Sequence, residues 1–200
     1  AGLENAMAEI IRRDSFMVSY TGERESVEQL KALSSSLKKS LKESSCQVPE
    51  VAITCEKKNE GFKTSGQVQY VARTGNFVKK GFTYTGALEI LKVALSYDYL
   101  WIQVRVKGGA YGCMSGFGTY GDSYLVSYRD PNLGQTNEVF EQTPEYVEQF
   151  DASERDMTKY IIGTISDMDT PRTPAMEGSR GLASWLTQTT LENIQKYRDE

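Results

Sequence analysis

The 200-residue sequence contains no histidine. Without an imidazole, the chain cannot build a Ser-His-Asp triad, a Cys-His pair or a histidine-ligated metal site from its own residues. Cysteine is also scarce, and Cys46, Cys55 and Cys113 are odd in number and lack any C-x-x-C spacing. We therefore expect reduced thiols instead of a disulfide framework or a zinc ribbon. Any catalysis in which this chain takes part must use other side chains.

Long apolar runs and basic stripes are missing as well. No stretch approaches the roughly 18 apolar residues of a membrane span. The formal net charge is −4, and the small cluster Lys38, Lys39 and Lys42 is expected to be the solvated end of a helix. We predict no membrane or nucleic-acid partner. The cysteine usage favours a cytoplasmic compartment, or an organelle matrix in a eukaryote.

What is present is the composition of a globular protein, with 39% hydrophobic and 25% charged residues. We expect a single domain over 1–200, with its core over about 16–200 and a lead-in helix over 1–15. No signal peptide is recognised at the start. The opening AGLENAMAEII predicts an amphipathic helix that starts without a preceding element of its own fold. We therefore expect the chain to be part of a longer protein.

Hydrophobic periodicity predicts an α+β fold with antiparallel pairing, since strands and helices come first and helices alone follow Pro131. Glycine, proline and capping residues punctuate the pattern. Thr143-Pro144, Ser153 with Asp156, and Thr189 with Glu192 are expected to begin helices. The predicted strands cover 16–22, 51–55, 67–73 and a hairpin of 111–120 with 123–130, and the predicted helices before Pro131 cover 25–42 and 85–107.

The stretch RVKGGAYG (105–112) places an arginine and a tyrosine six positions apart around two glycines. A phosphate loop is disfavoured, because the predicted order is helix, glycines, strand. The glycines could simply end the helix, with Tyr111 as a packed strand residue. Alternatively, Arg105 and Tyr111 face one cleft. Both are hydrogen-bond donors that could stabilise an oxyanion, or could bind a peptide backbone or carboxylate in the ground state.

Four stretches in the same order resemble the last domain of one peptidase family. The family is the insulinase/pitrilysin zinc metallopeptidases, and the similarity is to its presequence-protease branch, from about residue 16 to the end. The fold implied is an antiparallel or mixed sheet with helices on one face, of the LuxS/metallohydrolase-like type. The stretches are QVQYVARTGNF (67–77), YLWIQVRVKGGAYG (99–112), SYRDPN (127–132) and YIIGTISDMDTP (160–171).

The resemblance implies that this chain is the fourth, C-terminal domain of a longer enzyme that hydrolyses unstructured peptides in a closed chamber. The zinc ligands, in an H-x-x-E-H motif, would lie in the N-terminal half, which would be the partner of this chain. Tyr111 would stabilise the oxyanion and Arg105 would bind a substrate carbonyl. Gly108, Gly109 and Ala110 would contact the peptide. The chain alone would bind no metal and would be inactive.

Two other functions stay open. A non-catalytic insulinase-like scaffold domain would keep the fold but would have no reason to keep both Arg105 and Tyr111. An independent acyl-transfer enzyme is disfavoured because no base or activated nucleophile is evident. Arg129 and Asp130 are interpreted as a strand end and turn instead of a charge relay. Asp167 and Asp169 are interpreted as a helix end.

Overall fold

The computed structural model describes residues 2–43, 56 and 58–200. The strand predicted over 51–55 lies outside the described residues. The chain divides into two compact units, each described by itself: residues 1–61 with 171–189, and residues 62–170 with 190–200. Among the described residues, no helix is long and apolar enough to cross a membrane.

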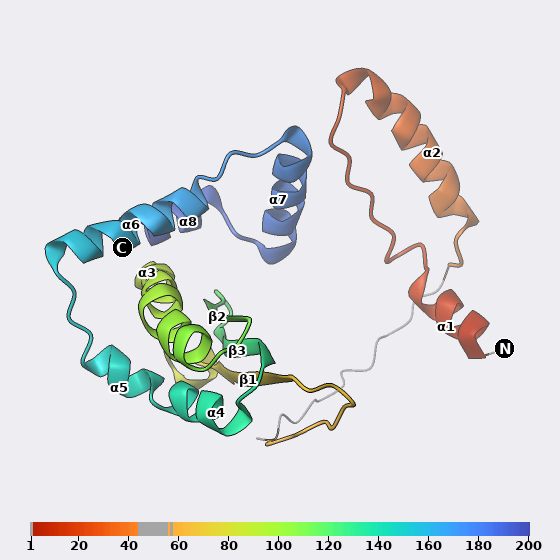
Figure 1. The fold of residues 1–200 in the computed structure, drawn as a ribbon. Helices are drawn as coiled ribbons and strands as arrows, with labels where there is room; N and C mark the ends of the chain where they lie inside the picture. The colour runs from red at the N-terminus through yellow and green to blue at the C-terminus, as the bar shows by residue number, and fades with distance from the viewer. Residues whose placement is uncertain (1, 44–55, 57) are drawn as a thin grey trace. The chain divides into compact units, whose positions relative to one another are not determined.

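The first unit consists of helices joined by extended segments (Figure 1). The helix predicted over 25–42 is confirmed, and Lys38 and Lys39 lie in its last turn, where cations favour the helix dipole. Thr173 caps another helix by accepting a hydrogen bond from the Met176 N–H. The elements are α1 (Gly2–Ile10), η1 (Arg24–Ser26), α2 (Val27–Ser40) and α7 (Pro174–Thr187).

The strand predicted over 16–22 is wrong. The segment is extended but has no ladder partner among the described residues. Met17 and Val18 stay 49% and 48% exposed. A strand needs a neighbouring strand to satisfy its backbone groups, so a short apolar run bounded by glycine is not sufficient.

The second unit contains a three-stranded antiparallel sheet with the order β1-β3-β2. Its strands are β1 (Gln69–Asn76), β2 (Gly112–Phe117) and β3 (Asp122–Asp130). The strand predicted over 67–73 and the hairpin are both confirmed. In the hairpin turn Gly121 has a φ of 90°, a conformation that favours glycine. The Gly118 N–H donates to the Asp122 carbonyl at 2.6 Å, which closes the turn.

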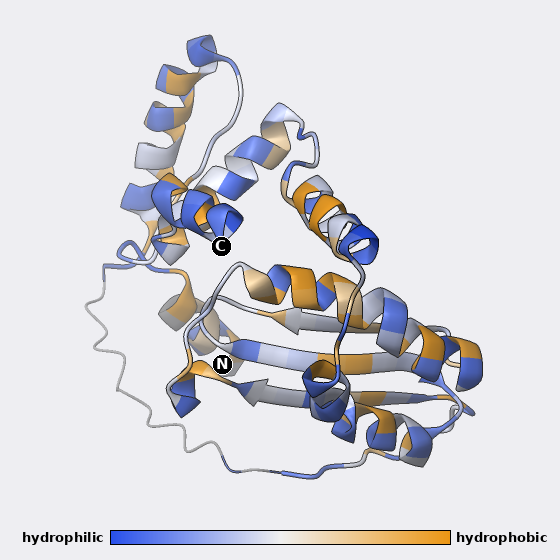
Figure 2. Ribbon diagram, turned by 90° about the vertical axis from the view of Figure 1, so that its left-hand side faces the viewer, coloured by the Kyte–Doolittle hydropathy of each residue, from blue (hydrophilic) through white to orange (hydrophobic). Residues whose placement is uncertain are grey.

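Helices cover one face of this sheet (Figures 1 and 2). α3 (Ala87–Ala94) continues without interruption into η3 (Leu95–Lys107), and α4 (Leu133–Glu141) follows β3. The core forms where these helices meet the inner side of the sheet. Its buried members are Val71, Leu95, Tyr99, Leu100, Val104, Ala110, Val139 and Phe140.

The helix predicted over 85–107 is confirmed, but from Leu95 onward it is wound as a π-helix. Wider winding, with i→i+5 hydrogen bonds, changes which positions share a face. Leu95, Leu100 and Val104 are almost fully buried, whereas Trp101 is 41% exposed. A 3.6-residue period of apolar positions therefore does not extend to the end of the helix.

The remaining helices follow the capping signals closely. Pro144 lies in the first turn of its helix, as predicted. Ser153 accepts a hydrogen bond from the Asp156 N–H at 3.2 Å. The last cap is one residue later than predicted, because Thr190 and Asn193 form a reciprocal capping box. These elements are η2 (Val78–Lys80), α5 (Thr143–Glu148), α6 (Glu154–Met168) and α8 (Leu191–Asp199). The α+β fold with an antiparallel sheet and helices on one face is confirmed.

Candidate functional site

The turn between η3 and β2 carries the two residues singled out in RVKGGAYG. The Gly109 N–H donates to the Arg105 carbonyl at 2.9 Å, and the Ala110 N–H donates to the Val104 carbonyl at 3.1 Å, which closes the helix. Gly109 has a φ of 76°. A Cβ on Gly108 would stand 2.5 Å from the Val104 carbonyl oxygen. One glycine therefore supplies the left-handed conformation and the other supplies the space.

Arg105 and Tyr111 lie together across this turn. The Arg105 Nη1 donates to the Tyr111 carbonyl oxygen at 2.7 Å. The guanidinium carbon is 4.1 Å from the centre of the Trp101 ring and 5.7 Å from that of the Tyr111 ring. Stacking of a guanidinium on an aromatic face restricts its orientation. Arg105 is therefore held in one orientation while most of its N–H groups remain available.

The Tyr111 ring is exposed but supported on its sides. Its side chain is 58% exposed. The Tyr128 ring meets it edge to face at 5.6 Å. The Arg129 guanidinium carbon lies 5.4 Å from the Tyr111 ring centre, and the Arg129 carbonyl accepts the Tyr111 N–H at 3.3 Å. Among the described residues, no protein group bonds the Tyr111 hydroxyl, so its O–H is open to a ligand.

Arg129 is the residue of this cluster that the sequence interpretation missed. It lies at the strand end, as predicted, but its φ of 49° is unusual for a residue with a side chain. Pairing of Gly112 with Tyr128 brings Arg129 beside Tyr111. The proximity of Arg129 to Tyr111 depends on this strand register, and no local sequence motif predicts it.

Ala110 does not share the exposure of its neighbours. Its side chain is 3% exposed and belongs to the hydrophobic core. The Gly108 carbonyl is also occupied, because the Asn132 Nδ2 donates to it. Of the three positions predicted to contact a peptide, only Gly109 is exposed, whereas Gly108 and Ala110 are buried.

The sheet face next to Tyr111 is lined by tyrosine rings that lie over glycines. A Cβ on Gly112 would collide with the Tyr128 ring, and one on Gly116 would collide with the Tyr124 ring. The two tyrosine rings therefore lie flat across glycines of the neighbouring strand. Tyr124 and Tyr128, four residues apart in β3, lie on this side of the hairpin. Tyr70, on the same side of β1, is 74% exposed.

Neither the thiol of Cys113 nor the carboxylate of Asp169 forms a second candidate catalytic site. Burial raises the pKa of the Cys113 thiol, with Asp130 adding to the rise and Arg105 opposing it, so the reactive thiolate is disfavoured. Asp169 follows the end of α6, as predicted, and is paired with Arg198 at 2.5 Å. Within the described residues, no group of three or more Cys, Asp or Glu side chains is arranged to hold a metal ion.

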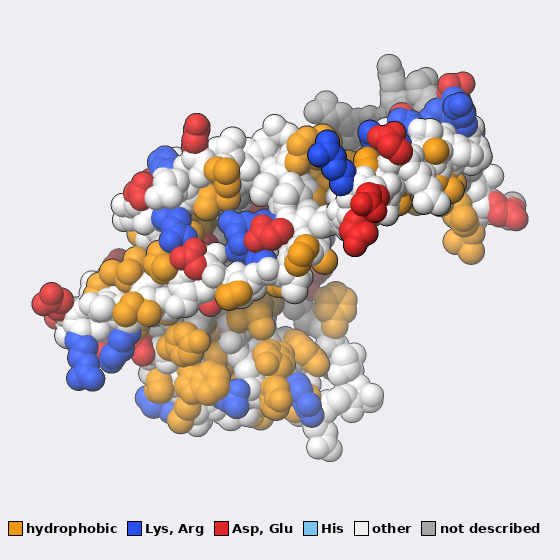
Figure 3. Space-filling model, turned by 90° about the horizontal axis from the view of Figure 1, so that it is seen from above, with side chains coloured by type: hydrophobic (Ala, Val, Ile, Leu, Met, Phe, Trp, Pro, Cys, Tyr) orange, Lys and Arg blue, Asp and Glu red, His pale blue; other side chains and the backbone are white. Residues whose placement is uncertain are grey.

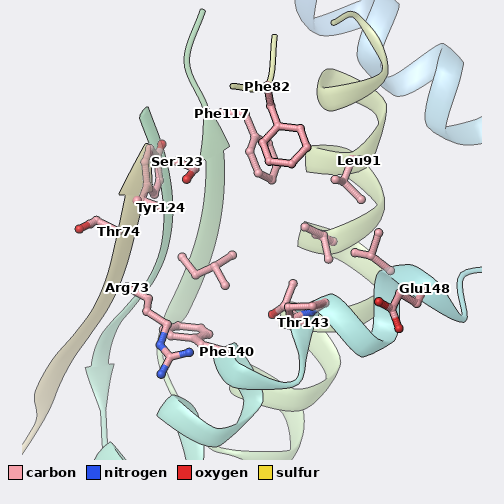
Figure 4. Close-up of a pocket in the computed structure, with 15 residues that line it drawn as sticks. Arg73, Thr74, Phe82, Leu91, Phe117, Ser123, Tyr124, Phe140, Thr143 and Glu148 are labelled. Atoms are coloured by element: carbon pink, nitrogen blue, oxygen red, sulfur yellow. The ribbon is translucent and has the colours of Figure 1, made fainter. Parts of the chain in front are cut away.

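A separate apolar cavity of about 860 Å³ opens between the other end of the sheet and the helices (Figure 4). Phe82, Phe117 and Leu91 gather at one end of it, and Arg73 and Phe140 lie toward the other. Arg73 is paired with Glu141. The described residues that line it include no cluster of titratable groups that could carry out a reaction.

Surface charge does not single out a further site. In Figure 3, Lys and Arg side chains lie near Asp and Glu over much of the face, and hydrophobic side chains gather in a broad patch in its lower part. On the face drawn there, the described Lys and Arg side chains of each unit form no continuous basic surface of the kind that follows a nucleic-acid backbone.

Comparison with known proteins matches residues 59–200 to the family described as the PreP C-terminal domain. "Protein HypA" of Clostridium perfringens is 42% identical over 191 residues, which cover 96% of this chain and 20% of that protein. "Presequence protease 1, chloroplastic/mitochondrial" of Arabidopsis thaliana is 37% identical over 145 residues, covering 72% of this chain and 13% of that protein. The chain thus spans a fifth or less of the length of these relatives.

A mitochondrial presequence protease of Aspergillus oryzae is 33% identical over 129 residues, which cover 64% of this chain and 12% of that protein. The matched family covers both the sheet and the η3–β2 turn that carries Arg105 and Tyr111. The resemblance seen in the four ordered stretches is therefore confirmed. The chain belongs to the PreP C-terminal domain family.

Proposed function

We propose that the chain is the C-terminal domain of a zinc-dependent oligopeptidase that hydrolyses unstructured peptides in a closed chamber, and that it contributes Arg105 and Tyr111 to the active site. The supporting observation is their geometry. A stacked guanidinium and an exposed phenol lie on one surface, with the guanidinium bonded to the Tyr111 backbone. The names of the relatives support the peptidase class.

Zinc does not fit the described residues of this chain, because they provide no metal-binding cluster and the sequence has no histidine. The metal and its ligands would belong to the N-terminal half of the same peptidase. Zinc there would activate a water molecule and polarise the scissile carbonyl. The chain described here would bind no zinc itself and would cleave nothing on its own.

Tyr111 would donate its phenolic O–H to the carbonyl oxygen of the substrate as that oxygen becomes negatively charged. Its exposed ring is held by Tyr128 and Arg129, so little reorganisation is needed when the charge develops. Donors placed in this way are typically worth about 10²–10³ in kcat.

Arg105 would bind a backbone carbonyl of the peptide next to the scissile bond. One N–H group holds the Tyr111 carbonyl, and the remaining N–H groups of the fork are directed by the stacking on Trp101. Of the glycine turn, the exposed Gly109 would contribute backbone surface only. The flat ring of Tyr128, beside Tyr111, would let an extended peptide approach closely.

One observation favours the alternative of a non-catalytic scaffold domain. The Arg105 bond to the Tyr111 carbonyl also closes the η3–β2 turn, so it could be retained for the fold alone. The two functions differ in the Tyr111 hydroxyl, because a scaffold does not need an unbonded, exposed phenol. We further propose that the substrates are peptides and that the partner is the N-terminal half. The proposed location is the cytoplasm or an organelle matrix.

The test is peptide hydrolysis by the full-length enzyme with Tyr111→Phe. Tyr124→Phe is the matched control, since it removes a hydroxyl from a tyrosine on the same sheet face. We expect kcat to fall by about 10²–10³ for Tyr111→Phe and to change little for the control. Equal activity of the two variants would favour the scaffold.

A further inference from the structure

A buried carboxylate lies next to the site, at the end of β3. Asp130 is 0% exposed. Its Oδ2 accepts hydrogen bonds from the Ser127 Oγ at 2.6 Å and the Thr136 Oγ1 at 2.7 Å. Its Oδ1 accepts the Asn132 N–H at 2.8 Å. No lysine or arginine among the described residues pairs with it, so these donors alone compensate its burial.

This bonding fixes the turn between β3 and α4, and that turn holds the site in two places. The Asn132 Nδ2 donates to the Gly108 carbonyl, one of the carbonyls that a helix end leaves without a partner. On the other side, the Arg129 carbonyl accepts the Tyr111 N–H at 3.3 Å. The η3–β2 turn is therefore held through its glycine and through its tyrosine.

We propose that Asp130 and Asn132 are positioning residues that set the distance between the Tyr111 hydroxyl and the Arg105 guanidinium. The inference rests on the proposed function of that pair. Asp130 fixes the turn, Asn132 links the turn to Gly108, and the link holds the η3–β2 connection in place. A small displacement of a group that acts on a developing charge lowers kcat more than it changes substrate binding.

The opposite end of the sheet offers a matched comparison. There the Asn76 Nδ2 donates to the Tyr120 carbonyl at 3.0 Å and to the Asp122 Oδ1 at 3.1 Å. Its Oδ1 accepts the Lys79 N–H at 2.9 Å. Asn76 thus holds a turn as Asn132 does, but that turn carries neither Arg105 nor Tyr111. Asn76→Ala therefore measures what the loss of such a link costs the fold.

The experiment uses the full-length peptidase with Asn132→Ala and Asn76→Ala. We expect kcat to fall roughly tenfold or more for Asn132→Ala, with KM within about threefold of wild type. Asn76→Ala should leave kcat near wild type at a comparable loss of melting temperature. Similar kcat values for the two variants would overturn the proposal.

Thr136 tests the carboxylate without removing it, in case Asp130→Asn does not fold. Thr136→Ser keeps the hydroxyl that bonds Oδ2, and Thr136→Val keeps the shape and loses the donor. We expect Thr136→Ser to keep a kcat close to that of the wild type. Thr136→Val should lower kcat by about as much as Asn132→Ala does. Equal kcat values for the two Thr136 variants would contradict the role of Asp130.

A double-mutant cycle separates this inference from the proposed function. If Asn132 acts through Tyr111, Asn132→Ala should have little further effect on kcat in a Tyr111→Phe enzyme. The same fold-loss in both backgrounds would overturn positioning and leave the role of Tyr111 intact. Full activity of Tyr111→Phe itself would overturn both.

Discussion

The two ends of the three-stranded sheet are built alike but differ in what they present. Each has a glycine with positive φ, Gly109 at one end and Gly121 at the other, and an asparagine that holds the turn. Of the two ends, and within the part of the chain that the structure describes, only the Gly109 end brings a guanidinium and an exposed phenol together. Turn construction is therefore a property of the fold, whereas the pairing of Arg105 with Tyr111 distinguishes one end as a candidate site.

The largest expected difference between the two ends of the sheet is in the effects of Gly109→Ala and Gly121→Ala on stability and on activity. Gly109→Ala has room for its Cβ, whose nearest neighbour would be Pro131 Cγ at 3.6 Å, so it incurs mainly the left-handed backbone cost of about 1–2 kcal/mol. Gly121→Ala adds a clash, since its Cβ would lie 2.6 Å from the Asn76 Oδ1. We expect Gly121→Ala to lower the melting temperature more and Gly109→Ala to lower kcat more.

Thermal melts of the full-length enzyme measure the loss of stability of each variant, and peptide hydrolysis measures the loss of kcat. If the less stable of the two variants were also the less active, activity would follow stability alone. The distinction between the two ends of the sheet would then disappear.

Arg129 gives a smaller and sharper effect, because its left-handed backbone and its side chain can be tested separately. Arg129→Gly removes both the strain and the guanidinium, whereas Arg129→Ala keeps the strain. We expect the glycine variant to be more stable than the alanine variant by about 1 kcal/mol. Both should lose several-fold in kcat/KM, because the Tyr111 ring loses a neighbour at 5.4 Å.

Denaturation and steady-state kinetics decide this prediction. Wild-type kcat/KM in Arg129→Gly would mean that the side chain does not support Tyr111. Equal stability of the two variants would mean that the φ of 49° is not costly.

The site elements that the sequence predicted correctly are those with local signals. Gly108-Gly109 ends a helix, and the hairpin follows from alternation and a glycine turn. These signals placed Arg105 and Tyr111 on either side of a tight turn, and the structure joins them by a hydrogen bond. Local rules suffice there because helix ends and short hairpins are determined by neighbouring residues.

The features of the site that could not be predicted from the sequence depend on contacts between residues far apart in the chain. Arg129 reaches Tyr111, and Asn132 reaches Gly108, only through the pairing of β2 with β3 and the packing of the following turn. The π-helical winding of η3 likewise departs from the 3.6-residue period by which a helix is recognised in sequence. The strand predicted over 16–22 failed for the same reason, because strand formation needs a partner that local sequence does not specify.

The most direct measurement of the central claim is the inhibition constant of a tetrahedral transition-state mimic, a phosphinic peptide, for the full-length enzyme and for Tyr111→Phe. Because Tyr111 is proposed to bind the oxyanion and not the ground-state carbonyl, the inhibition constant should rise by about the same factor by which kcat/KM falls, roughly 10²–10³. An unchanged inhibition constant, with Tyr111→Phe properly folded, would contradict the account.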